Sequence, residues 1–128
     1  MLDFAGCDQI GVNNCALYGC GTLGVCAENC RNLYVQNTDI YECSMGAVWA
    51  SGCYDVRLED SSVHDCGLKD DDFNAYVLFM PQSTTGFAVV NTVIEQNDVQ
   101  YLLDSRYSQE VYMLGCQIRS NQIGRAHV

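Results

Sequence analysis

The chain has 128 residues, with 16 acidic and 6 basic side chains and a formal charge of -10. This charge argues against a basic nucleic-acid groove, because phosphate binding needs clustered lysine and arginine, and an anionic membrane surface would repel the chain. Apolar residues make up 48% of the sequence, so a disordered tail is excluded. No run of 18 apolar residues and no leader pattern occur. We therefore expect one folded domain with no nucleic-acid and no membrane partner.

The sequence repeats with a period of 23 residues. After Cys66 the step widens once to 31 residues and then settles at 24, so an insertion of eight residues falls between Cys66 and Gly86. A fixed period in this range is the signature of a solenoid. The apolar columns are Ile10, Leu33, Val56, Phe87 and Val111; Val12, Val35, Leu58, Val89 and Met113; and Leu17, Ile40, Val63, Ile94 and Ile118.

Short alternations of apolar and other residues within one repeat are typical of β-strands rather than helices. In chain order, the second repeat predicts strands around 33–35, 38–40 and 48–50, with a turn at Asn37. Three short strands per repeat predict an all-β solenoid of stacked parallel strands. It should have about five coils of 23 to 24 residues, one of which carries the insertion. Neighbouring coils would lie roughly 4.8 Å apart.

One column of turn residues follows the first strand of each repeat. It contains the residue types that most readily adopt a positive φ. Asparagine side chains stacked at one spacing can also hydrogen-bond along the column. We therefore expect a sharp bend and an asparagine ladder at this corner. The column is Asn14, Asn37, Asp60, Asn91 and Gly115.

The unit from Val35 to Cys43, Val-x-Asn-Thr-Asp-Ile-Tyr-x-Cys, resembles the repeats of right-handed parallel β-helices, the architecture of pectate-lyase-like proteins. The resemblance covers residues 2–122 and implies a right-handed parallel β-helix, with an extracellular or cell-surface location. Leucine-rich repeats have a similar period and are the alternative. However, Ile40 lies three residues after Asn37 rather than two, and no helical segment follows each unit.

Neither end of the sequence carries the polar capping repeat that hides the open strand edges of a solenoid. We therefore expect residues 1–122 to be an internal segment, whose partner is the remainder of its own longer chain stacking on both open ends. Residues 123–128, Ile-Gly-Arg-Ala-His-Val, depart from the pattern and resemble one translation frame of a sequencing adapter. An ordinary C-terminal tail is the alternative.

Most of the nine cysteines follow the repeat. One column contains Cys7, Cys30 and Cys53, a second contains Cys20, Cys43 and Cys66, and Cys15 shares its column with Thr38 and Ser61. We predict that they are small residues that pack in the core and in tight turns. A disulfide and a zinc site are the alternatives. Stacked Cβ atoms would lie farther apart than a disulfide prefers, and no Cys-x-x-Cys pair occurs.

Four aromatic residues are candidates for carbohydrate binding. Tyr18, Tyr41 and His64 form an outward column on the second strand of each repeat, and Trp49 points outward on the third. Exposed aromatic rings can stack against sugar rings, so a polysaccharide is the candidate partner. Stacking between neighbouring strands is the alternative role for these rings.

The triplet Asn37-Thr38-Asp39 resembles one found in polygalacturonases, which share this architecture. The Gly-His-Gly and Arg-x-Lys elements of those enzymes are absent here. A glycosidase needs two carboxyl groups at a defined separation, and no spacing requires Asp39 to pair with the acidic residues 70–72. We therefore predict no catalytic residue and a non-catalytic structural or display role. The alternatives are part of a carbohydrate-active enzyme, a polysaccharide lyase or glycoside hydrolase, and a carbohydrate-binding or adhesive surface.

The insertion contains Asp70, Asp72 and Asn74 in the pattern Asp-x-Asp-x-Asn, which is the front half of a calcium loop. Oxygen ligands at alternate positions suit calcium, so these residues are the candidate metal ligands and calcium is the candidate cofactor. Ala75 stands where such a loop needs glycine, and Pro81 stands where it needs glutamate. A solvated acidic loop without any cofactor is the alternative.

A calcium site in this loop predicts a melting temperature that rises when millimolar calcium replaces chelator, because a ligand that binds only the folded chain stabilises it. Calorimetry measures the rise, and a variant with both Asp70→Asn and Asp72→Asn should lose it. An unchanged melting temperature in the wild-type chain would leave the solvated loop as the correct interpretation.

Overall fold

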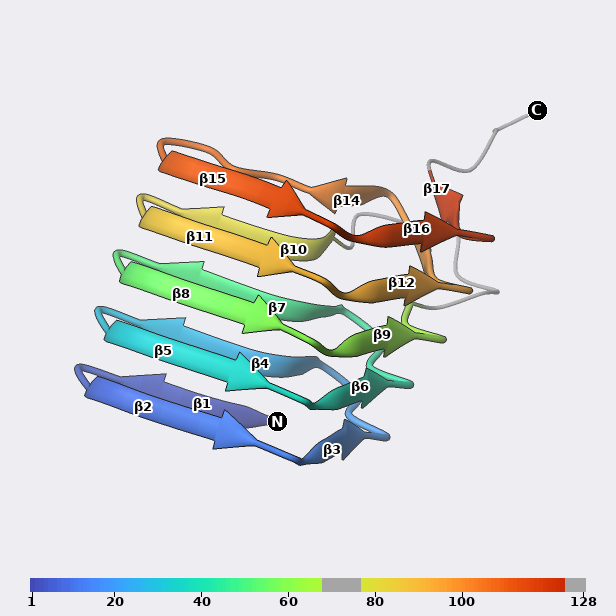
Figure 1. Cartoon of the computed structure of the whole chain (residues 1–128), viewed down its shortest axis with the longest axis horizontal. Coiled ribbons are helices and arrows are strands. Elements are labelled where there is room, and N and C mark those ends of the chain that lie inside the picture. The colour runs from blue at the N-terminus through green and yellow to red at the C-terminus, as the bar shows by residue number, and fades with distance from the viewer. Residues whose placement is uncertain (68–76, 124–128) are drawn as a thin grey trace.

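A computed structural model describes residues 1–67 and 77–123 of the chain. Figure 1 shows a stack of coils, each built from short β-strands. The three main sheets each contain five strands, and each strand pairs in parallel with its equivalent in the next coil. Within the described ranges there is no helix, and therefore none long and apolar enough to cross a membrane. The predicted right-handed parallel β-helix of about five coils is confirmed.

Three parallel sheets form the walls of the stack, and we name them A, B and C (Figure 1). Sheet A contains β1 (Leu2–Ala5), β4 (Leu23–Glu28), β7 (Gly46–Ser51), β10 (Val77–Gln82) and β14 (Tyr101–Leu103). Sheet B contains β2 (Asp8–Asn13), β5 (Arg31–Gln36), β8 (Tyr54–Glu59), β11 (Thr85–Val90) and β15 (Gln109–Leu114). Sheet C contains β3 (Ala16–Tyr18), β6 (Asp39–Tyr41), β9 (Ser62–His64), β12 (Val93–Glu95) and β16 (Gln117–Arg119). A small fourth sheet pairs β13 (Asp98–Val99) with β17 (Gln122–Ile123).

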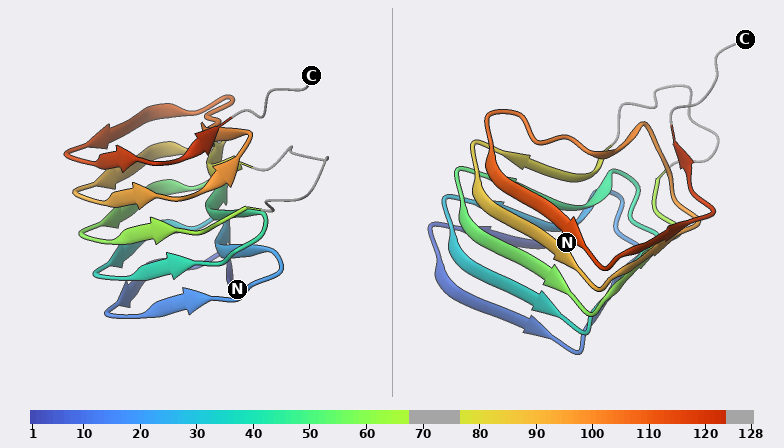
Figure 2. Two further views of the ribbon diagram at one scale, coloured as in Figure 1. Left: turned by 90° about the vertical axis from the view of Figure 1, so that its right-hand side faces the viewer. Right: turned by 45° about the horizontal axis from the view of Figure 1, so that its top comes forward.

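The predicted apolar columns coincide with the strand register. In sheet B, Leu33 pairs with Ile10 and Val56, and the column continues to Phe87 and Val111 across the longer steps. Leu33, Val56 and Phe87 are at most 1% exposed. Sheets B and C meet at a corner (Figure 2), and the inward side chains of all three sheets fill the interior. The dry core therefore runs along the stack axis.

The register holds on both sides of residues 68–76. Gly67 forms a parallel bridge with Asp98, which is 31 positions later and thus matches the widened step. A Cβ at Gly67 would lie 1.8 Å from the carbonyl oxygen of Asp98, so only glycine permits this approach. At the C-terminal side, Ile123 still pairs with Val99, one residue beyond the predicted end of the solenoid segment.

The coil bends at left-handed residues in four columns, of which the sequence analysis identified one. The predicted column has φ values between 48° and 65°. Three further columns use the same backbone conformation, although glutamate, glutamine, serine and tyrosine adopt it less readily than asparagine or glycine. Their members are Gly6, Asn29, Gly52, Ser83 and Tyr107; Gln9, Asn32, Asp55, Gly86 and Glu110; and Gly19, Glu42, Asp65, Gln96 and Ser120.

The asparagine ladder expected at the first bend is not confirmed. The side-chain amide of Asn37 donates to Oδ1 of Asn13, at 3.2 Å, rather than to Asn14 of its own column. The backbone supplies the bond between coils instead, because the amide of Asn37 donates to the carbonyl of Glu59 at 3.2 Å. An amide pair occurs in another column, where Nδ2 of Asn97 donates to Oδ1 of Asn121 at 2.9 Å.

Small side chains next to the bends connect successive coils. The hydroxyl of Ser61 donates to the carbonyl of Glu59 at 2.8 Å and accepts the backbone amide of Thr38 at 3.1 Å. The thiol of Cys53 acts in the same way, since it donates to the carbonyl of Ser51 and accepts the amide of Cys30, both at 3.5 Å. A thiol and a hydroxyl therefore serve the same purpose in these columns.

All nine cysteines lie within the described residues, and all are free thiols. The predicted packing role is confirmed for four of them, Cys30, Cys43, Cys53 and Cys66, which are buried. Hydrogen bonding with Cys66 and burial raise the pKa of Cys43, and burial raises the pKa of Cys53, so both thiols stay protonated at neutral pH. Cys7 and Cys15 are exposed in the first coil of the described stack.

Ile40 and Ile118 occupy the same column, and this gives a matched test of the core. Ile40 is fully buried, whereas Ile118 in the last coil is 47% exposed. We expect Ile40→Ala to lower the free energy of unfolding by about 2–5 kcal/mol, because it leaves a cavity in a dry interior. Ile118→Ala should cost less than about 1 kcal/mol. Urea denaturation measures both, and equal losses would contradict the assigned core.

Candidate functional site

The outward face of sheet C carries two columns of side chains that could act on a ligand. Each strand of this sheet has three residues, of which the middle one points inward and the outer two point outward. The first column is Ala16, Asp39, Ser62, Val93 and Gln117. The second column is Tyr18, Tyr41, His64, Glu95 and Arg119.

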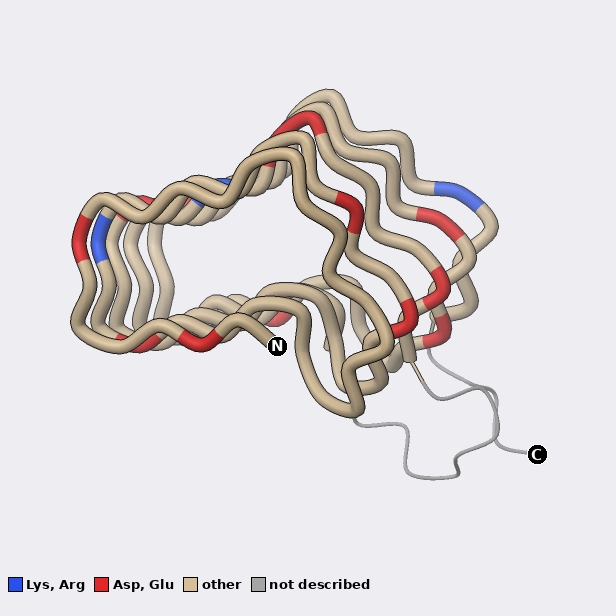
Figure 3. Tube along the Cα trace, turned by 90° about the horizontal axis from the view of Figure 1, so that it is seen from below, with Lys and Arg blue, Asp and Glu red and all other residues tan. Residues whose placement is uncertain are grey.

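Acidic residues lie along sheet C and its bends. Figure 3 looks along the stack and shows Asp and Glu positions in the part of the coil that contains sheet C and its bends. They lie in the strands of sheet C and in the turns on either side of it, and Arg119 is the basic residue of the sheet. The acidic positions are Asp39, Glu42, Asp60, Asp65 and Glu95. A cation or a neutral polar ligand fits this surface better than an anion does.

Three of the four aromatic candidates form a continuous stack. The ring centroids of Tyr18 and Tyr41 are 4.9 Å apart with the planes 6° from parallel, and Tyr41 and His64 are also 4.9 Å apart, at 8°. This is the spacing of adjacent strands, so the register itself creates the stack. Both faces of Tyr41 are therefore covered by neighbouring rings. A ligand can reach the edge of Tyr41 but cannot stack on it, and carbohydrate binding by this column stays a prediction.

Trp49 lies elsewhere. It belongs to β7 in sheet A, and its indole N–H donates to the carbonyl of Val77 at 2.7 Å. In register it pairs with Cys26 of β4. Because sheet A and sheet C are different walls of the stack, the four aromatic candidates do not form one binding face.

His64 is held between two carboxylates. Its Nε2 lies 3.1 Å from Oδ1 of Asp39, one coil away, and its Nδ1 lies 2.7 Å from Oδ2 of Asp65. The hydroxyl of Ser62 also donates to Oδ1 of Asp39. A neutral imidazole can donate from only one nitrogen, whereas an imidazolium donates from both. The protonated ring therefore fits this arrangement best.

The pKa of His64 follows from this geometry. Desolvation alone would lower it, but the hydrogen bond with Asp65 and the charges of Asp39 and Asp65 outweigh this effect, and the pKa is raised above its ordinary value. The structure shows for His64 the stacking that the sequence analysis gave as the alternative to carbohydrate binding, and the sequence analysis missed its two carboxylate partners. The sequence did indicate one contact of this cluster, because Asp39 and Ser62 are separated by one period and should therefore be neighbours.

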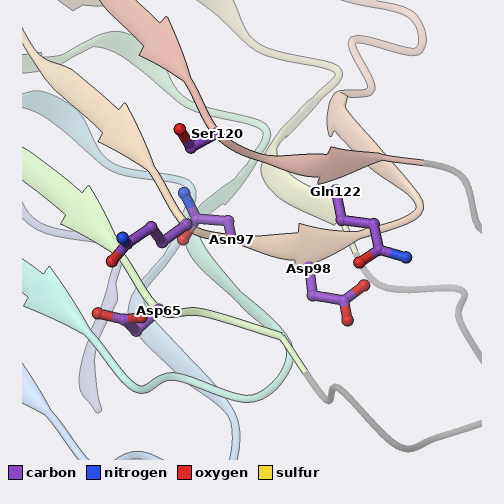
Figure 4. A pocket seen from close by; sticks show the side chains of 6 residues that line it. Asp65, Asn97, Asp98, Ser120 and Gln122 are labelled. Carbon is purple, nitrogen blue, oxygen red and sulfur yellow. The ribbon is translucent and has the colours of Figure 1, made fainter.

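Two depressions lie on either side of this cluster. One, of about 640 Å³, follows the corner between sheets B and C and includes Asn37, Asp39, Asp60 and Ser62 in its wall. The other, of about 490 Å³, is shown in Figure 4, where Asp65 and Asp98 lie among polar side chains beside β13 and β17. Asp39 therefore borders one depression and Asp65 borders the other.

The proposed calcium ligands Asp70, Asp72 and Asn74 lie outside the described residues, as do the acidic residues 70–72 considered as partners of Asp39. Across residues 1–67 and 77–123, no group of three or more His, Cys, Asp or Glu side chains is arranged to hold a metal ion.

His64 makes a testable contribution to stability. Because its pKa is raised in the folded chain, its stabilising effect is complete below the unfolded value of about 6.5 and is lost as the pH rises through the folded pKa. We expect the stability difference between wild type and His64→Gln to be larger at pH 6 than at pH 8, as measured by urea denaturation. An NMR titration assigns the ring by comparison with His64→Gln, and Asp65→Asn should lower its pKa. A stability difference that is the same at both pH values would contradict the position of His64 between two carboxylates.

Comparison with known proteins agrees with the geometry. The model of the "Right handed beta helix region" family matches residues 2–127. No curated protein matches the chain. Among solved structures, the chain is similar to a protein from Parabacteroides merdae described as a "putative glycosyl hydrolase", with a TM-score of 0.58 and 13% identity over 73% of this chain. The match covers 39% of that protein, and at this identity it shows the fold alone. The chain belongs to the right-handed β-helix family.

Proposed function

We propose that this chain is a rigid, non-catalytic segment of a larger β-helix protein, which displays ordered columns of polar side chains. The observation that carries the proposal is that outward side chains form contacts between neighbouring coils. The surface is thereby held at the fixed spacing of the strands. A display surface needs such order, because fixed side chains lose little entropy when a ligand binds.

Contacts of this kind occur on both sheets B and C. On sheet B, Nε2 of Gln36 donates to Glu59 at 2.7 Å, and the hydroxyl of Tyr34 donates to Asp55, also at 2.7 Å. On sheet C, the stacked rings lead to an ion pair in which Nε of Arg119 lies 2.9 Å from Glu95. Each exposed pair contributes little to stability. Together, however, these contacts oppose movement of neighbouring coils relative to one another.

The carboxylates of sheet C are engaged in the same network, which supports a structural role for them. Asp39 accepts from Ser62 and faces His64, while Asp65 faces the other nitrogen of His64. Both carboxylates therefore already have hydrogen-bond partners within the coil stack. A glycosidase instead needs two carboxyl groups that flank the sugar.

The alternative is part of a carbohydrate-active enzyme, either a polysaccharide lyase or a glycoside hydrolase. Two features favour it: Asp39 and Asp65 border adjacent depressions, and the similar Parabacteroides merdae protein is described as a "putative glycosyl hydrolase". In this alternative the two carboxylates would flank the sugar, and His64 would have to leave its position between them.

A cleavage assay separates the two functions. The chain is incubated with polygalacturonate, pectin and xylan, and new reducing ends and unsaturated products are measured. We expect no more product from wild type than from a variant with both Asp39→Asn and Asp65→Asn, because the carboxylates serve the structure. A cooperative thermal transition would show that the variant is folded, even where its melting temperature is lower. Product formed by wild type and lost in this folded variant would overturn the proposal in favour of the enzyme.

A further inference from the structure

The outward face of sheet B has a niche that no other part of the described chain fills. Its volume is about 430 Å³, and its walls are Gln9, Ile10, Gly11, Asn32 and Tyr34. Gly11 and Tyr34 are register partners in neighbouring coils. Because Gly11 has no side chain, the place beside Tyr34 in its column is empty. A Cβ added to Gly11 would meet no atom within 4 Å.

The backbone does not explain the glycine at this position. Gly11 lies inside β2, and its φ is not in the left-handed region. It also makes no close approach to another segment, unlike Gly67. A strand position of this kind accepts β-branched and aromatic residues well. The space next to Tyr34 is therefore a property of the surface and not a by-product of a turn.

The groups around the niche are partly fixed and partly free. The hydroxyl of Tyr34 donates to Oδ2 of Asp55 at 2.7 Å, which orients the ring. Nδ2 of Asn32 donates to Oδ1 of Asp8 at 3.0 Å, which orients that amide. The side chain of Gln9 is exposed and has no hydrogen bond with another described residue. An oriented ring and amide reduce the entropy lost on binding, and Gln9 can adapt to a ligand.

The geometry points to a binding site for a neutral, hydroxyl-bearing ring, such as one pyranose unit of a glycan. The Tyr34 ring offers an apolar wall for the C–H face of such a ring, and the amides of Gln9 and Asn32 supply donors and acceptors for its hydroxyl groups. The five lining residues carry no charge, which suits a neutral ligand, and the nearby carboxylates of Asp8 and Asp55 are already bonded to Asn32 and Tyr34. The volume lies in the range of small-ligand sites.

The niche differs from the aromatic stack of sheet C, where neighbouring rings cover both faces of Tyr41. It adds a ligand class to the display role proposed above, and the two claims fail separately. Cleavage of a polysaccharide would contradict the non-catalytic role and leave the niche in place. Absence of sugar binding would contradict the niche and leave the display role in place.

Saturation-transfer NMR on the whole chain tests the site. The probes are the methyl glycosides of glucose, galactose and xylose, together with choline as a cationic probe. Gly11→Leu fills the niche without straining the backbone. Gly21→Leu is the matched control, because Gly21 is also exposed, is not left-handed and has no atom within 4 Å of an added Cβ. Thermal melts confirm that each variant is folded.

We expect transfer to at least one glycoside from wild type and from Gly21→Leu, and a loss to background in Gly11→Leu. Tyr34→Ala should also lose the signal, whereas Tyr34→Phe, which keeps the ring and loses the bond to Asp55, should retain part of it. Equal signals from Gly11→Leu and Gly21→Leu, transfer to choline alone, or no transfer to any glycoside would overturn the inference.

Discussion

Parallel, in-register pairing between coils is the constraint on which the rest of this structure depends. Each residue has its equivalent in the next coil as a direct neighbour, at the spacing of adjacent strands. A slip of one residue would turn every inward side chain outward. The same constraint acts on the outside, where it places the rings of Tyr18, Tyr41 and His64 4.9 Å apart. The core and the surface columns are thus two results of one register.

The register also determines how buried polar groups are satisfied. Side chains at the bends sit one above another, so each can donate within its own coil and accept an amide from the next. Ser61 and Cys53 both do this, with oxygen and sulfur in the same role. Unpaired buried amides are costly, and these columns avoid that cost with whichever small donor is present. The abundance of cysteine therefore has a structural explanation that requires neither a disulfide nor a metal.

Display of a fixed surface suits this architecture, because outward contacts connect coils without closing over the face. The surface has two distinct regions. Sheet C presents carboxylates bound to His64 and an aromatic stack in which both faces of Tyr41 are covered. Sheet B presents an aromatic ring, Tyr34, beside an empty position at Gly11. The ring of Tyr34 thus has an open position beside it in its column, whereas both faces of Tyr41 are covered by neighbouring rings.

The sequence by itself determined the period, the inward columns, the first column of bends and the packing role of the four buried cysteines, because these depend on one spacing that recurs from repeat to repeat. It also placed Asp39 one period before Ser62. Only the tertiary structure decided two kinds of feature. The first depends on side-chain direction and comprises the position of His64 between two carboxylates and the turn of Asn37 toward Asn13. The second is the backbone conformation of the three further columns of left-handed bends. Periodicity specifies which residues are neighbours along the stack, whereas rotamers and diagonal contacts between columns arise only when the coil closes in three dimensions.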